Sequence, residues 1–217
     1  EPPVKIPARL SSFDWKNVWR VVLNRNILIL GGVNFFFFAC QFCFSAYLTL
    51  FLTREAGFPV VQAGYFFALA YLIGAIARIC WTLISDYFLG GRRKGILVFI
   101  TCMELLSLFI LTLTSFFPAL NKFLLFVVLV FGMSGIGWNA ILLILLGEAA
   151  GKESIGLATA TGFFFGFLGG LLCPPFFGCI VDQTGIYGYG WLFLTFCAAS
   201  ILLLLNFFRE KGPEREF

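Results

Sequence analysis

The sequence contains no histidine and few charged residues, and both absences restrict what the chain can be. Without histidine, His-ligated metal sites and His-dependent acyl transfer are excluded, and no paired acids stand at a spacing suited to hydrolysis. Charged residues make up 12% of the chain, whereas an average soluble domain has about 25%. These absences argue against an enzyme and against a water-soluble globular domain.

Apolar sequence takes the place of charge: hydrophobic residues make up 60% of the chain, and its mean hydropathy is +0.97. A membrane-spanning helix needs about 20 mostly apolar residues. Six segments meet that requirement: 27–52, 59–85, 95–117, 123–147, 155–181 and 190–208. Strands of a β-barrel are shorter and alternate in polarity, which these runs do not. We therefore predict an all-α, multi-pass membrane protein, with residues 27–208 in the lipid bilayer.

The basic residues are distributed unevenly around these spans. Because the predicted loops are short, Lys and Arg should gather on the cytoplasmic side. One side holds only Arg54 and Lys122, Arg78 lies inside a span, and all other Lys and Arg residues fall on the opposite side. We predict that the protein lies in the cell (inner) membrane, with both termini and the loop at 92–94 on the cytoplasmic side. The net charge of +4 then reflects topology and not nucleic-acid binding.

The polar segments at the two ends are expected to flank the membrane domain as a linker (1–26) and a cytoplasmic tail (209–217). Residues 1–26 lack the apolar core of a signal peptide. Trp15, Val18, Trp19 and Val22 would share one face of a helix there. Such a face suits a helix lying on the membrane surface, and a plain cytoplasmic lead-in is the alternative.

Seven cysteines lie within the apolar spans, and Cys40 and Cys43 form a Cys-x-x-Cys pair. A metal site of that type needs further Cys or His ligands, and the chain has no histidine. Small buried hydrophobic residues are the better interpretation of these cysteines. We expect neither a metal nor a cofactor.

The most specific motif lies between the second and third spans, where an apolar run ends at Asp86 and a basic cluster follows. Asp86 together with Gly91, Arg92 and Arg93 resembles the conserved cytoplasmic loop motif of the major facilitator superfamily. The family pattern has a Gly, then an Asp three residues on, a basic residue, and Gly-Arg-Arg or Gly-Arg-Lys. This chain departs from it at Thr82 and Tyr87 and by one extra loop residue.

The resemblance implies both a fold and an activity. The fold is the C-terminal half of a twelve-helix transporter, with six helices arranged as two inverted three-helix repeats and an N-terminal six-helix half as the missing partner. The activity is transport of a small organic solute by alternating access, as a secondary transporter or symporter. A non-transporting membrane receptor or scaffold with the same fold is the alternative.

Polar residues inside the first and fourth spans are the candidate solute-binding positions. Asn34, Gln41 and Ser45 fall on one narrow helical stripe, which should face protein or a water-filled cavity. Hydrogen bonding between helices would explain the stripe equally well. The resemblance places the first and fourth spans beside the transport cavity and so favours solute binding. For the same reason Trp138 and Asn139 in the fourth span are candidates, with simple packing as the alternative for each.

Arg78 and Glu104 are the charged residues inside the predicted spans. Arg78 would lie about 12 Å from its helix end, and Glu104 at a similar depth on the next helix. Three interpretations compete: a structural Arg78–Glu104 ion pair, a snorkelling Arg78, or an Arg78 that binds an anionic solute while Glu104 carries a coupling proton. Arg78 suggests an organic anion as the solute, although an amphipathic or neutral compound fits the low polarity of the spans.

Two sets of residues are candidates for conformational roles. Asp86 and Glu148 stand at the C-terminal ends of predicted helices, where an anion needs a positive partner. With Gly91, Arg92 and Arg93 they are predicted to form a cytoplasmic latch that holds one conformation. In the fifth span, Gly166 and Gly170 lie on a small-residue stripe, and Pro174 and Pro175 should kink or break the helix, which suggests a hinge. A static kink is the alternative.

Overall fold

A computed structural model describes residues 15–88, 90, 92–151 and 154–210. Among these residues there is no β-strand, and six helical stretches are long and apolar enough to cross a membrane. The six predicted spans and the all-α, multi-pass membrane fold are therefore confirmed. The stretches are α2 (Arg25–Arg54), α3 (Val60–Phe88), α4 (Arg93–Phe116), the interrupted span Pro118–Ala150, α7 (Ile155–Thr184) and α8 (Tyr187–Phe207).

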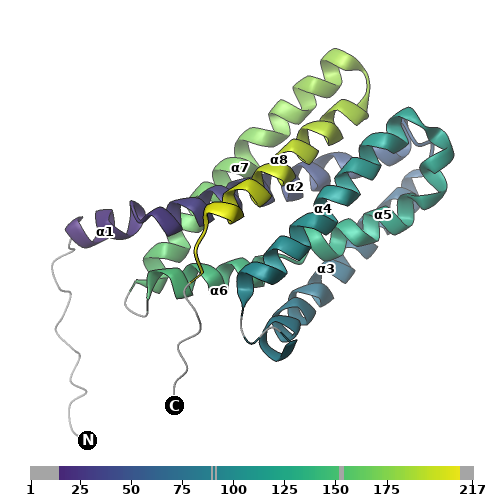
Figure 1. Ribbon diagram of the computed structural model, residues 1–217. Coiled ribbons are helices and arrows are strands. Elements are labelled where there is room, and N and C mark those ends of the chain that lie inside the picture. Colours follow the sequence, from purple (N-terminus) through teal and green to yellow (C-terminus); the bar gives the residue numbers. More distant parts are fainter. Residues whose placement is uncertain (1–14, 89, 91, 152–153, 211–217) are drawn as a thin grey trace, which may run out of the picture.

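A short helix, α1 (Trp15–Val22), precedes the spans and projects from the bundle in Figure 1. Trp15 and Trp19 on its predicted apolar face are exposed, whereas Val21 is buried with Ile27 and Ala158. The side chain of Asn24 caps α2 by accepting a hydrogen bond from the N–H of Asn26 at 2.9 Å. α1 is thus attached to the bundle by its end, with its tryptophans on the surface.

Helices α2 and α7 make the most extensive helix–helix contact among the described residues, and glycines on α7 face bulky residues on α2. A Cβ atom at Gly169 would lie 2.1 Å from the carbonyl oxygen of Phe35, so the two backbones touch there. Gly166 faces Phe38 and Gly170 faces Phe42. Small residues permit this approach, and packing in an apolar medium depends on it.

The fourth span is not one α-helix. A 3-10 turn (Pro118–Phe123) leads into α5 (Leu124–Phe131), a π-helical turn η2 (Gly132–Ile136) follows, and α6 (Asn139–Ala150) completes the span. η2 packs directly on α3: a Cβ at Gly132 would lie 2.4 Å from the carbonyl oxygen of Ala70. π-Helical turns of this kind are often found at functional sites.

The break expected in the fifth span is absent. Pro174 and Pro175 lie inside α7, which continues as an α-helix from Ile155 to Thr184. The two prolines therefore do not end the helix, and the interruption occurs instead in the fourth span, at η2. Proline removes backbone donors from a helix but does not force it to end when the surrounding helices support it.

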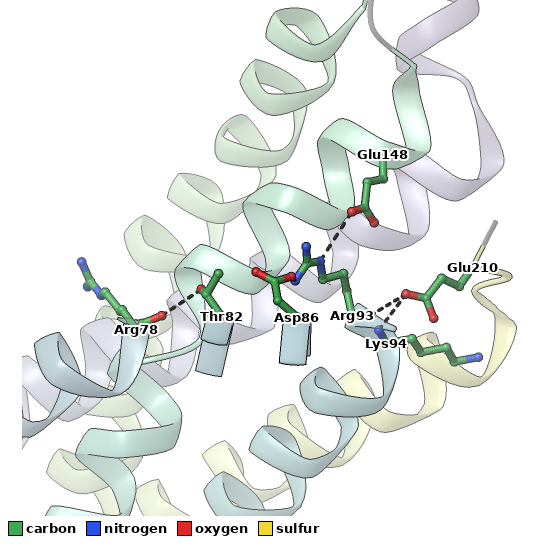
Figure 2. Close-up of polar contacts among 7 residues, drawn as sticks. All are labelled: Arg78, Thr82, Asp86, Arg93, Lys94, Glu148 and Glu210. Carbon is green, nitrogen blue, oxygen red and sulfur yellow. Dashed lines mark hydrogen bonds and ion pairs between the residues drawn. The ribbon is translucent and has the colours of Figure 1, made fainter. Parts of the chain in front are cut away.

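The two ends of the bundle differ in their polar contacts. At one end, which we call the basic end, lie Asp86, Arg93, Lys94, Glu148 and Glu210 (Figure 2). At the other, Glu55 accepts a hydrogen bond from the N–H of Tyr187 at 2.8 Å and so caps the start of α8. A hollow of about 460 Å³ opens beside this contact, and Arg54, Glu55, Asp182 and Tyr187 are among the residues that line it.

Candidate functional site

Polar side chains from α2, α3 and α6 are joined by hydrogen bonds in the interior of the spans. The amide of Asn139 on α6 donates to Oε1 of Gln41 on α2 at 3.4 Å. The hydroxyl of Ser45 donates to the main-chain carbonyl oxygen of Gln41, one turn earlier in α2, at 2.6 Å and is hydrogen-bonded to the hydroxyl of Tyr71 on α3. We call these four side chains the polar chain.

Arg78 is connected to the polar chain through η2. Its Nε donates to the carbonyl oxygen of Ile136 at 3.2 Å, and Nδ2 of Asn139 approaches the same oxygen at 3.5 Å. Arg78 is partly buried and, in Figure 2, points away from the charged cluster at the basic end. The guanidinium is therefore held beside the amide of Asn139 and not at the membrane surface.

Other carbonyl groups of η2 also accept hydrogen bonds from side chains. Nε1 of Trp81 on α3 donates to the carbonyl of Met133 at 2.8 Å, and Nε1 of Trp138 donates to that of Gly135 at 3.0 Å. A backbone carbonyl left open within a membrane span is costly unless another group satisfies it. The side chains of Arg78, Trp81 and Trp138 supply the donors, so they fix the interruption in place.

Two of the predicted solute-binding residues, Asn34 and Trp138, make helix-packing contacts in this structure. Asn34 is 2% exposed and donates to the carbonyl of Gly162 on α7 at 2.6 Å. Trp138 is 1% exposed and stacks on Phe37, with ring centroids 4.6 Å apart. Both also border a small crevice of about 10 Å³ next to Asn139. Of the predicted stripe, Gln41 and Ser45 belong to the polar chain, whereas Asn34 joins α2 to α7.

The expected ion pair between Arg78 and Glu104 is not formed. Glu104 is fully buried on α4, and its carboxylate oxygens have no hydrogen-bond partner in the described structure. The two helices are consecutive but hardly touch each other: α3 packs mainly on the interrupted span, and α4 packs on both that span and α8. The similar depth expected from the sequence therefore did not bring Arg78 and Glu104 together, which explains the error in the prediction.

Arg93 is the centre of the charged cluster at the basic end (Figure 2). Its Nη1 lies 2.5 Å from Oδ1 of Asp86, at the end of α3, and its Nε lies 3.5 Å from Oε1 of Glu148, at the end of α6. The Arg93 side chain is 12% exposed, while both acids are 46% exposed. Water screens such contacts, so each pair stabilises the fold only modestly.

Of the other predicted latch residues, Arg92 takes no part in the ion pairs of the described residues. Arg92 is exposed and serves as the N-cap residue of α4 without a side-chain cap bond. Gly91 lies outside the described residues. The structure therefore brings together Asp86, Arg93 and Glu148 from three helices, and leaves Arg92 at the surface.

The candidate hinge residues of α7 lie against α2. Gly166 and Gly170 are buried under Phe38 and Phe42, and the hydroxyl of Tyr47 donates to the carbonyl of Pro174 at 3.0 Å. A rotation of α7 at this level would have to break these contacts. The Cys-x-x-Cys pair, Cys40 and Cys43, consists of buried free thiols, and the described residues contain no cluster of potential metal ligands.

Two contributors to these clusters were missed at the level of sequence. Tyr71 joins the polar chain, and its position on the same helical face as Arg78 was the available signal. Glu210 accepts hydrogen bonds from the N–H groups of Arg93 and Lys94 (Figure 2). No spacing rule links Glu210 to a loop so far away in the sequence.

Comparison with known proteins gives two matches. A family model described as Major Facilitator Superfamily matches residues 1–174. A curated relative, the probable galactarate/D-glucarate transporter GudP of Bacillus subtilis (strain 168), is 20% identical over 201 residues. The alignment covers 92% of this chain but 43% of the relative. The chain thus spans less than half the length of the curated relative that it matches.

Proposed function

The chain belongs to the major facilitator superfamily, and we propose that it forms the C-terminal six-helix half of a secondary transporter for a small hydroxylated organic anion. In this proposal an N-terminal six-helix half completes the transport cavity and alternates with this half about a central solute. The observation that carries the proposal is the link between Arg78 and the polar chain through the carbonyl oxygen of Ile136.

The chemistry of these residues suits a carboxylate with neighbouring hydroxyl groups. A guanidinium has several N–H donors in a planar fork, and Nε alone is used on Ile136 in the described structure. The remaining donors can pair with a carboxylate. Amide and hydroxyl groups of Gln41, Asn139, Ser45 and Tyr71 can exchange hydrogen bonds with solute hydroxyls. The substrates in the relative's name, galactarate and D-glucarate, are hydroxylated dicarboxylates, which supports this class.

The charged cluster at the basic end supplies the conformational part of the proposal. Asp86, Arg93 and Glu148 form a latch that holds α3, α4 and α6 together in one state and separates in the other. By the positive-inside rule, this end lies on the cytoplasmic side of the cell membrane. Gly166 to Pro175 of α7 would act as a flexible segment, because Pro174 and Pro175 leave two helical carbonyls without N–H partners.

Uptake by the natural, full-length protein in proteoliposomes tests the solute class. We expect saturable uptake of hydroxylated mono- or dicarboxylates and no uptake of the corresponding neutral sugars. Arg78→Gln should raise KM about tenfold or more, since a hydrogen bond to a charged group contributes about 1.5–3 kcal/mol. Arg25→Gln is the control because Arg25 is exposed at the start of α2.

Tyr71→Phe tests the polar chain with a smaller change. Loss of one neutral hydrogen bond should raise KM about fivefold. Tyr65→Phe is the matched control, since Tyr65 lies on the same helix and is 65% exposed. The proposed solute class would be wrong if the protein took up neutral sugars and if neither Arg78→Gln nor Tyr71→Phe changed the KM of that uptake.

A further inference from the structure

Glu210 lies just beyond the end of α8 and contacts the start of α4 (Figure 2). Its Oε1 accepts hydrogen bonds from the N–H of Arg93 at 2.6 Å and from the N–H of Lys94 at 3.2 Å. The first N–H groups of a helix have no acceptor within the helix. The N-cap residue, Arg92, offers no side-chain acceptor. Glu210 therefore caps α4 from the other end of the chain, with a carboxylate suited to the positive end of the helix dipole.

A second contact fixes the same segment. Nζ of Lys94 donates to the carbonyl oxygen of Phe208 at 2.7 Å, and the Phe208 side chain is 2% exposed. We call Phe208–Glu210 the tail segment. It is held at α4 by a buried ring, a main-chain carbonyl and a carboxylate, which together define both its position and its direction.

Arg93 links the two contacts: Glu210 binds its backbone N–H, and its side chain forms the ion pairs of the latch. Arg93 has a long side chain with many rotamers, and it must reach Asp86 on one helix and Glu148 on another. Both acids are half-exposed, so each ion pair alone is weak. Simultaneous pairing then depends on where the Arg93 backbone sits, and Glu210 sets that position.

We propose that Glu210 is a positioning residue for the latch and that the tail segment is part of the switching machinery. It holds the first turn of α4 where Arg93 can pair with Asp86 and Glu148 at once. Loss of the Glu210 carboxylate opens the latch although all three latch residues remain. This inference rests on the proposed latch and is independent of the identity of the solute.

Ser85 provides a reporter for the state of the latch, because it is fully buried on α3 next to Asp86. In the natural, full-length protein in lipid vesicles, the exposed Cys80, Cys102 and Cys179 are first replaced by serine. Ser85→Cys is then introduced, and its labelling rate with a hydrophilic maleimide is measured. Buried Cys43 reports the integrity of the fold, since it should stay unlabelled unless the protein unfolds.

We expect Glu210→Gln to increase the labelling rate at position 85 about fivefold, as for loss of one helix-capping side chain. Asp86→Asn should have a similar effect, and Glu210→Asp should retain part of the slow labelling. Arg25→Gln, at an exposed residue at the start of α2 and outside the tail segment, should leave the rate unchanged. The double variant Glu210→Gln with Asp86→Asn should label no faster than either single variant, because both act through Arg93.

Three outcomes would overturn the proposal. The first is an unchanged labelling rate in Glu210→Gln together with faster labelling in Asp86→Asn. This result would show that the latch forms without help from the tail segment. The second is strict additivity of the two substitutions, which would show that they act independently. The third is an unchanged labelling rate in both variants, which would contradict the proposed latch as well as the proposed role of the tail segment. The KM tests at Arg78 are unaffected by any of these, so failure of the solute proposal stays distinguishable.

Discussion

Gly169 and Phe35 bring the backbones of α7 and α2 into direct contact: a Cβ atom at Gly169 would lie 2.1 Å from the carbonyl oxygen of Phe35. A backbone atom cannot move aside as a flexible side chain can. The separation of the two helices at this level is therefore set by the absence of a side chain at one position. Asn34 and Gly166 meet along the same interface, where the Asn34 amide reaches the carbonyl of Gly162.

The first prediction follows from this contact. Gly169→Ala should force α7 away from α2 and destabilise the protein by about 1–3 kcal/mol, the range for overpacked sites. Gly156→Ala on the same helix is the control, because a Cβ there meets no atom within 4 Å. It should be neutral or stabilising by up to about 1 kcal/mol. Thermal unfolding in detergent compares the two variants, and equal midpoints would contradict the prediction.

The second prediction concerns the π-helical turn. Trp81→Phe removes the donor to the carbonyl of Met133 and leaves that oxygen unsatisfied in an apolar layer. We expect destabilisation of about 1–3 kcal/mol and faster amide exchange in residues 132–139. Trp19→Phe, at an exposed tryptophan of α1, should change neither quantity. Hydrogen exchange read by mass spectrometry checks this, and unchanged exchange around η2 would contradict it.

The third prediction separates charge from geometry in the latch. Arg93→Lys keeps the positive charge, but a single ammonium group on a flexible stem should not reach Asp86 and Glu148 together. We expect the conformational equilibrium to shift by about 1 kcal/mol, which is about fivefold in population. Arg92→Lys is the matched control because Arg92 is exposed and has no ion pair among the described contacts. Uptake rates at saturating solute, compared at equal protein amount, measure the difference.

The fourth prediction uses the two charged residues within the spans. Arg78→Glu and Glu104→Arg are each expected to impair membrane insertion or stability. The double variant that carries both should not restore either property, since the two residues do not pair. Glu104→Gln should fold within about 1 kcal/mol of the parent, because the carboxylate makes no hydrogen bond that the amide would lose. Membrane insertion and unfolding midpoints test both statements. Rescue by the double swap would show that another conformation pairs them.

The membrane helices could be predicted from sequence because each depends on one local property, about 20 apolar residues in a row. The family motif was recognisable for a related reason: Asp86 and Arg93 lie in one short loop. Their ion pair needs only a turn between consecutive helices. Features that depend on a single segment of the chain can thus be predicted from sequence patterns.

Features that depend on which helices touch were not predictable in the same way. Arg78 and Glu104 were matched by expected depth, but depth does not reveal that α3 and α4 hardly touch each other. Prolines suggested a break in α7, yet the interruption occurs at η2, where Gly132 lets α3 approach closely. Glu210 reaches α4 only because α8 ends beside it. Rotation of helices about their axes, and the partners that result, come from packing of the whole bundle.

The capping contacts at the two ends of α8 have a mechanical consequence. Glu55, at the end of α2, binds the first N–H of α8, and the tail segment after α8 binds the start of α4. A slide of α8 along its axis would break both contacts, so α2, α4 and α8 should behave as a stiff frame. The interrupted span packs on this frame along α4 and meets α3 through η2, but neither it nor α3 is tied to the frame by these capping contacts. Besides the flexible segment of α7, we therefore expect movement relative to the frame in α3 and α5–α6, the helices that carry Tyr71, Arg78 and Asn139.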